Sequence, residues 1–191
     1  MKRSTPSFFP PARDRVHEVC GAGVYGFAFA LLSQCGGRAI WVREAWRNQQ
    51  INPSGFADYF DPSRLTICNT SDQTETLAVA EEALRSGAVS LVVMVLGKPV
   101  GLTEGRRLQL AAKQGKTRGL AVIPEGMGSN AAETRWRCTP VFETSDADKP
   151  RRDSTLQCWE LIKNKSGTLG VWHVRWDAAS RRFNMVSPVG E

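Results

Sequence analysis

Two spacings of apolar residues alternate along the first two thirds of the chain. Short apolar runs typical of buried strands are separated by segments whose apolar residues recur every three or four positions, as on one face of a helix. The predicted strands cover residues 16–20, 38–43, 65–68, 88–96 and 119–123, and the predicted helices cover residues 27–34, 73–86 and 104–114. The run at 88–96 (AVSLVVMVL) is apolar almost throughout, as in a central parallel strand covered on both faces. This alternation predicts a doubly wound parallel sheet.

The pattern changes after the small-residue segment 124–133. Four β-rich segments follow, at residues 134–141, 156–163, 170–177 and 182–186, and short polar connections between them favour hairpins. Residues 144–153 are polar without periodicity and predict a mobile excursion. The predicted fold class is therefore α/β: a mostly parallel twisted sheet flanked by helices, with C-terminal antiparallel strands.

The predicted organisation is an extended lead-in followed by one domain. The lead-in covers residues 1–15, and the domain covers residues 16–191, with a parallel core at about 16–123 and an antiparallel extension at about 134–186. A chain of 191 residues is long enough to bury a core without disulfides or metals.

Composition limits the chemistry of the chain. The five cysteines form no CxxC pair and the two histidines, His17 and His173, are far apart, so the sequence predicts neither a metal site nor a cofactor. Free thiols fit a reducing compartment. The N-terminal residues do not read as a signal peptide, and the longest apolar runs are too short to span a bilayer, so we expect a cytoplasmic protein without a membrane partner. The net charge of +6 permits an acidic or nucleic-acid partner without requiring one.

A glycine-rich loop lies between the first predicted strand and helix. Gly21, Gly23 and Gly26 match a dinucleotide-binding G-x-G-x-x-G pattern, and Glu44 follows near the position of a ribose-binding acid. The same residues align with a Walker A loop, but Phe27 then stands at the lysine position and Ala28 at the Ser/Thr position. Neither side chain can bind phosphate or Mg²⁺, and the Phe27 ring would enter the space that a triphosphate needs. The plainest interpretation is a strand–turn–helix whose glycines allow tight packing.

Residues 60–95 (FDPSRLTICNTSDQTETLAVAEEALRSGAVSLVVMV) resemble the RecA core between its second strand and its Walker B strand. Among RecA-like proteins the resemblance is to the SulA-related ImuA family. It covers about residues 16–186 and is carried by HEV at 17–19, WV at 41–42, TRWR at 134–137 and WELIKNKSGTLGVWHVRWD at 159–177. The metal-orienting aspartate of the RecA family would fall near Val95, and residues 88–100 contain no carboxylate. The resemblance therefore implies a RecA-like fold with a degenerate phosphate loop and no ATPase activity.

The resemblance also implies a function. ImuA proteins belong to the bacterial SOS response to DNA damage, in which translesion DNA synthesis causes mutagenesis. The implied role is that of a non-catalytic adaptor for an ImuB-type subunit, a Y-family polymerase homologue, with an error-prone replicative-type polymerase and RecA as further partners. Two alternatives stay open: a nucleotide- or dinucleotide-binding protein, and a SulA-like inhibitor of cell division. The chain lacks RecA's N-terminal oligomerisation segment and C-terminal domain, so we do not expect RecA-type filaments.

Two surfaces are candidates for binding. Weak electrostatic contact with DNA, or contact with an acidic partner, is predicted for Arg106, Arg107, Lys113, Arg135 and Arg137. Trp136 should face away from the two neighbouring arginines and into the core. A partner interface is predicted on the C-terminal strands, at Trp159, Trp172, Trp176, Arg175, Arg181 and Arg182. The alternatives are a solvated helix face in the first case and tryptophans that only seal the sheet in the second.

Overall fold

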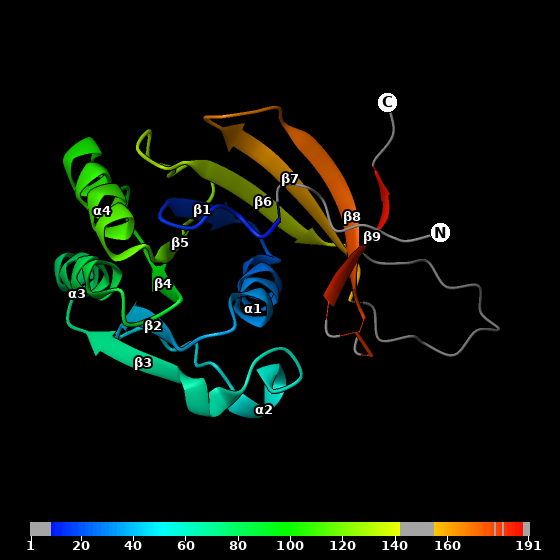
Figure 1. Cartoon of the computed structure of the whole chain (residues 1–191), viewed down its shortest axis with the longest axis horizontal. Coiled ribbons are helices and arrows are strands. Elements are labelled where there is room, and N and C mark those ends of the chain that lie inside the picture. Colours follow the sequence, from blue (N-terminus) through cyan, green and yellow to red (C-terminus); the bar gives the residue numbers. More distant parts are fainter. Residues whose placement is uncertain (1–8, 142–154, 178, 181, 189–191) are drawn as a thin grey trace.

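The computed structural model of the chain describes residues 9–141, 155–177, 179–180 and 182–188. Within these ranges one nine-stranded sheet has the order β3-β2-β4-β5-β1-β6-β7-β8-β9 (Figure 1). The strands are β1 Val16–Cys20, β2 Ala39–Glu44, β3 Leu65–Thr70, β4 Leu91–Val95, β5 Arg118–Val122, β6 Thr134–Pro140, β7 Gln157–Asn164, β8 Gly170–Asp177 and β9 Arg182–Pro188. The strands from β3 to β6 pair in parallel, and those from β6 to β9 pair antiparallel. The predicted fold class is confirmed.

Helices cover both faces of the parallel part of the sheet. They are α1 Val24–Cys35, α2 Pro53–Phe56, α3 Gln73–Ser86 and α4 Leu102–Gly115, with a 3-10 turn at Pro62–Arg64. Helices α1 and α2 lie on one face, and α3 and α4 lie on the other (Figure 1). In β4, Val93 packs in the core on the α1 side, while Val92 and Met94 pack on the α3–α4 side. This two-sided burial explains the unbroken apolar run of the central strand.

Local side-chain capping explains where α2 and α3 begin. Asp72 caps α3, because its Oδ1 accepts a hydrogen bond of 2.9 Å from the Glu75 amide, and Gly87 ends the helix in a left-handed conformation. Helix α2 was not predicted. It is a single turn that Asn52 caps by accepting a hydrogen bond from the Ser54 amide, and Pro53 occupies its first position.

Strand β6 joins the two halves of the sheet. It pairs in parallel with β1 on one side and antiparallel with β7 on the other. The predicted excursion at residues 144–153 and most of the predicted lead-in lie outside the described residues. In the described ranges no helix combines the length and the apolar character needed to cross a membrane.

Candidate functional site

The glycine turn between β1 and α1 is closed by β6. The amide of Gly23 donates a hydrogen bond of 2.7 Å to the carbonyl oxygen of Cys138. Gly21 has a φ of +95°, and a Cβ added there would lie 2.5 Å from the same oxygen. A Cβ at Gly26 would lie 2.0 Å from the amide nitrogen of Gln157 on β7. These glycines therefore permit close packing against β6 and β7, as the plainest interpretation of the sequence has it.

Phe27 and Ala28 face the core behind this turn. Both side chains are fully buried. The Phe27 ring centroid lies 5.5 Å from that of Phe9, 5.4 Å from that of Trp136 and 4.8 Å from that of Trp159. The ring therefore joins an aromatic cluster beneath α1.

The other positions expected to bind a nucleotide are occupied by internal contacts. Glu44 is 5% exposed and accepts a hydrogen bond of 3.2 Å from Nε of Arg47. At the carboxyl end of β4, Val95 and Leu96 are both buried. The candidate ribose-binding acid is thus already paired, and apolar side chains end the strand where a Walker B aspartate would stand.

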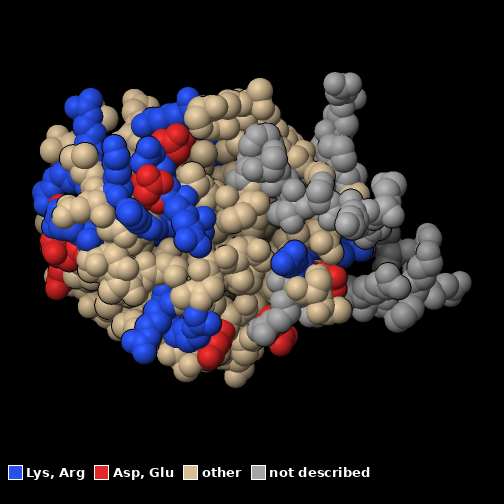
Figure 2. Space-filling view, viewed as in Figure 1, with Lys and Arg blue, Asp and Glu red and all other residues tan. Residues whose placement is uncertain are grey.

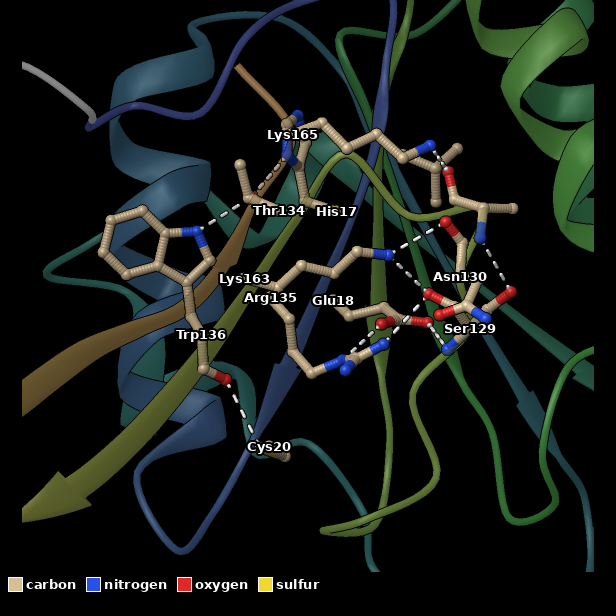
Figure 3. A network of polar contacts seen from close by, with 12 residues as sticks. His17, Glu18, Cys20, Ser129, Asn130, Thr134, Arg135, Trp136, Lys163 and Lys165 are labelled. Carbon is tan, nitrogen blue, oxygen red and sulfur yellow. Dashed lines mark hydrogen bonds and ion pairs between the residues drawn. The ribbon is translucent and has the colours of Figure 1, made fainter. Parts of the chain in front are cut away.

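A buried ion pair holds the connection between β5 and β6 (Figure 3). The Glu18 side chain is 4% exposed; its Oε2 lies 2.7 Å from Nε of Arg135, and its Oε1 accepts a hydrogen bond of 2.8 Å from the Ser129 amide. The Lys163 ammonium donates to the carbonyl oxygens of Ser129 and Asn130, each at 2.9 Å. Arg135 therefore forms an internal ion pair with Glu18, which corrects its prediction as a surface contact for DNA.

A second set of polar contacts surrounds His17 on the other face of β1. Its Nδ1 lies 2.7 Å from the hydroxyl of Thr134, and its Nε2 lies 2.9 Å from the carbonyl oxygen of Ala12. The Thr134 hydroxyl oxygen also accepts a hydrogen bond of 3.0 Å from Nε1 of Trp136. Burial lowers the pKa of His17 to about 4, so the ring is neutral at pH 7. Trp136 is fully buried, as predicted.

The thiols near the glycine turn have no reactive character. Cys20 and Cys138 are buried, and burial raises the pKa of both thiols, that of Cys138 to well above its usual range. Protonated buried thiols are poor nucleophiles and poor metal ligands. These side chains act as small apolar core residues.

The other basic residues that were predicted to contact DNA or an acidic partner differ in whether they form ion pairs within the protein. Arg107 pairs with Glu81 of α3 at 2.8 Å. Arg137 is exposed and pairs with Glu160 at 2.9 Å. Arg106 and Lys113 are exposed and form no ion pair with any described residue. The structure thus brings Arg106 and Lys113 to one surface and leaves Arg135 and Arg137 on another element.

The predicted aromatic interface on the C-terminal strands is mostly core. Trp159 is 1% exposed, and its ring lies 5.0 Å from that of Phe183. Trp176 is 9% exposed, and its ring lies 4.3 Å from that of Tyr59. Trp172 is half-buried and lies 5.8 Å from the ring of Trp136. The strands therefore use these rings to seal the sheet, and the prediction of an exposed aromatic patch is wrong for Trp159 and Trp176.

The basic residues of that predicted interface are placed unequally. Arg175 is half-buried, Arg182 is exposed, and Arg181 lies outside the described residues. The most exposed tryptophan of the described chain, Trp46, was not singled out from the sequence. It is 65% exposed, and the Arg47 guanidinium lies 5.0 Å from the centroid of its ring. The polar sequence after β2 offers no signal that separates this tryptophan from buried ones.

A surface groove lies between α4 and the end of the β5–β6 connection, and we call it the α4 groove. It has a volume of about 470 Å³. Four cationic side chains line it together with one carboxylate and two exposed leucines: Arg15, Arg106, Lys113 and Lys165, Glu133, and Leu102 and Leu110. Lys and Arg side chains gather on the side of the molecule where α4 lies (Figure 2). The groove is therefore a candidate site for a charged ligand.

The fold is that of a mixed α/β protein. Its glycine turn between β1 and α1 packs against β6, and the Gly23 amide is bonded within the protein. No family model matches the chain. Protein ImuA of Caulobacter vibrioides, in strain NA1000 and in strain ATCC 19089, is 32% identical over 203 aligned residues, which cover 92% of this chain and 81% of the relative. The chain therefore belongs to the ImuA family, and the predicted membership is confirmed. With it comes the setting of damage-induced mutagenesis that the resemblance implied.

Proposed function

We propose that the protein is a non-catalytic accessory factor of damage-induced translesion DNA synthesis, which acts in the cytoplasm as an adaptor for an ImuB-type polymerase subunit. Membership of the ImuA family supports the setting. One observation carries the non-catalytic part: the Gly23 amide is bonded to Cys138 at 2.7 Å, so the turn is closed by the protein's own backbone.

This contact supports a function that does not involve binding or hydrolysis of ATP. A phosphate loop binds by directing free backbone amides at the anion, aided by a lysine and by a hydroxyl on Mg²⁺. Here Phe27 and Ala28 are buried at the lysine and hydroxyl positions. Opening the turn would break the bond to β6 and disturb the ring cluster around Phe27. Tight binding and hydrolysis of ATP are therefore not part of the proposed function.

Calorimetry with Mg²⁺-ATP and, separately, with NAD tests this part. We expect no saturable heat with either ligand. The double variant Phe27→Lys/Ala28→Thr should gain no ATPase activity, because Val95 ends β4 without a carboxylate. The variant should also be less stable, since it buries a lysine within an aromatic cluster. Tight Mg²⁺-dependent binding of ATP by the unmodified protein would contradict the proposal.

Co-purification tests the adaptor part. The protein should retain an ImuB-type subunit in the absence of nucleotide, and addition of the error-prone replicative-type polymerase or RecA shows whether the assembly extends to them. Over-expression in undamaged cells separates the competing role. Cells that grow as filaments without DNA damage would point to a SulA-like inhibitor instead. The dinucleotide alternative is disfavoured because Glu44 is buried and paired with Arg47.

A further inference from the structure

Hydrogen bonds connect the elements that form the walls of the α4 groove. Gln109 of α4 donates hydrogen bonds from Nε2 to the carbonyl oxygens of Val16, at 2.8 Å, and Ala131, at 3.1 Å. Its Oε1 accepts a hydrogen bond of 3.1 Å from the Val16 amide. Lys165 donates a hydrogen bond of 2.8 Å to the Ala131 carbonyl oxygen from the other side. Because one glutamine joins the helix, the first strand and the β5–β6 connection, the groove is formed before any ligand arrives.

The charges of the groove are largely uncompensated. Arg15 is already paired: it lies 3.1 Å from Asp14 and 3.7 Å from Glu133, and Glu133 is the only carboxylate among the described lining residues. The other three cationic side chains have no such partner among the described residues. The Lys165 ammonium donates to a neutral carbonyl oxygen, so its charge is not cancelled. Arg106 and Lys113 have no acidic partner among the described residues, whereas the neighbouring Arg107 is held by Glu81 on α3. The groove therefore attracts an anionic ligand.

Two exposed leucines in the groove favour an anionic ligand that also has apolar side chains. Leu102 is 48% exposed and Leu110 is 67% exposed, and both line the groove. With Arg106 and Lys113 they form one stripe along α4, at successive spacings of four, four and three residues, in which apolar and basic side chains alternate. Exposed aliphatic side chains bordered by charge are typical of protein interfaces.

Nucleic acid fits this surface less well than a protein segment does. A phosphate backbone has nothing to bury against Leu102 and Leu110 and would meet the carboxylate of Glu133. None of the described residues that line the groove is aromatic, so bases have no ring on which to stack. We propose that the α4 groove docks an acidic amphipathic helix of a protein partner, whose leucine-like side chains cover the two leucines and whose carboxylates pair with Arg106, Lys113 and Lys165. This inference rests on the proposed adaptor function, because it states where the partner binds.

Fluorescence anisotropy tests the groove directly. The probe is a fluorescein-labelled synthetic helical peptide in which leucine and glutamate alternate at every fourth position along one face. The control is the same peptide with glutamine in place of each glutamate. Saturable binding of the acidic peptide is expected. It should weaken about tenfold or more in Arg106→Glu/Lys113→Glu and in Leu102→Ser/Leu110→Ser, since each change removes one half of the complementarity. All four side chains are exposed, so thermal stability should not change.

Arg38→Glu provides the matched control. Arg38 is exposed, precedes β2 and does not line the groove, and the change in charge is the same as at each groove position. Binding should be unaffected by this substitution. Equal binding to the unmodified protein and to the groove variants would overturn the proposal. So would preferential binding of a mixed-sequence single-stranded oligodeoxynucleotide that displaces the peptide from the groove.

Co-purification with an ImuB-type subunit separates this inference from the proposed function. If the subunit is retained equally by the unmodified protein and by Arg106→Glu/Lys113→Glu, the docking site lies elsewhere while the adaptor role stands. If the peptide binds in the groove but the subunit is never retained, the adaptor role fails while the groove remains a site for acidic helices. Loss of both interactions in the groove variants alone supports both proposals.

Discussion

Two arginines on β6 should differ sharply in their contribution to stability. Arg135 and Arg137 are two residues apart, and each pairs with a glutamate, at 2.7 Å to Glu18 and at 2.9 Å to Glu160. Their surroundings differ: Arg135 is 20% exposed and Glu18 is 4% exposed, whereas Arg137 is 44% exposed and Glu160 is 37% exposed. We predict that Arg135→Ala destabilises the protein strongly and that Arg137→Ala does so only slightly.

The magnitudes follow from burial. Removing one partner of a buried ion pair costs about 3–5 kcal/mol, because the other charge is left without compensation. Glu18 would keep the hydrogen bond from Ser129, and its charge also acts on the Lys163 ammonium, so we expect the lower end, about 3 kcal/mol. In a domain of this size that lowers the melting temperature by roughly 6–12 °C. An exposed pair contributes about 1 kcal/mol or less, which is the expected cost of Arg137→Ala.

Urea denaturation followed by circular dichroism measures both values. The pair Glu18→Ala and Arg135→Ala completes a double-mutant cycle, and the double variant should be destabilised by less than the sum of the single changes. Equal losses of stability in Arg135→Ala and Arg137→Ala would refute the reasoning, because Arg135 would then behave as a surface residue. An additive cycle would show that the two side chains do not interact.

Three further perturbations check other parts of the structure. Gly21→Ala should cost more than 2 kcal/mol in a urea titration, because its Cβ would lie 2.5 Å from the Cys138 carbonyl oxygen at a φ of +95°, whereas Gly36→Ala, with open space around it, should cost about 1 kcal/mol. The pKa of His17 is about 4 when folded, below its ordinary value of 6.5, so the unfolded chain binds the proton more readily. Stability should therefore be full above pH 6.5 and fall by roughly 3 kcal/mol towards pH 4, and a His17→Gln variant should lose less over this range. Trp46→Phe should remove most of the emission that acrylamide quenches, since Trp46 is 65% exposed, and unchanged quenching would contradict its placement.

Local patterns were sufficient to predict most of the elements. The helix at 73–86 was predicted with its correct bounds. Its N-cap, its apolar face and the glycine that ends it all lie within one short stretch of sequence, so a local pattern is enough to predict it. Helix α1 begins at Val24, three residues before the predicted start, since the glycines at 23 and 26 masked its first turn. These glycines pack closely against β6 and β7, and the local sequence contains no signal of that tertiary contact.

The candidate site depended on pairings that local sequence does not contain. Arg135 and Arg137 look equivalent in the sequence TRWR. They differ because β1 places Glu18 opposite Arg135 in the sheet, with more than a hundred residues between the two strands. Trp159 and Trp176 were likewise assigned by composition to a surface, yet the rings of Phe183 and Tyr59 meet them inside the fold. Alternation along a strand says which residues share a face, but not which face is covered.

The position of β1 between β5 and β6 has a consequence for synthesis on the ribosome. Strand β1 is buried along its whole length, yet both of its sheet neighbours are encoded about a hundred residues later. At roughly 5–20 residues per second, the ribosome makes β5 and β6 several seconds after β1. During that interval the backbone N–H and C=O groups along both edges of β1 have no partner strand. The first strand of this sheet to be translated thus gains both of its neighbours only after β2, β4 and β5 have gained theirs.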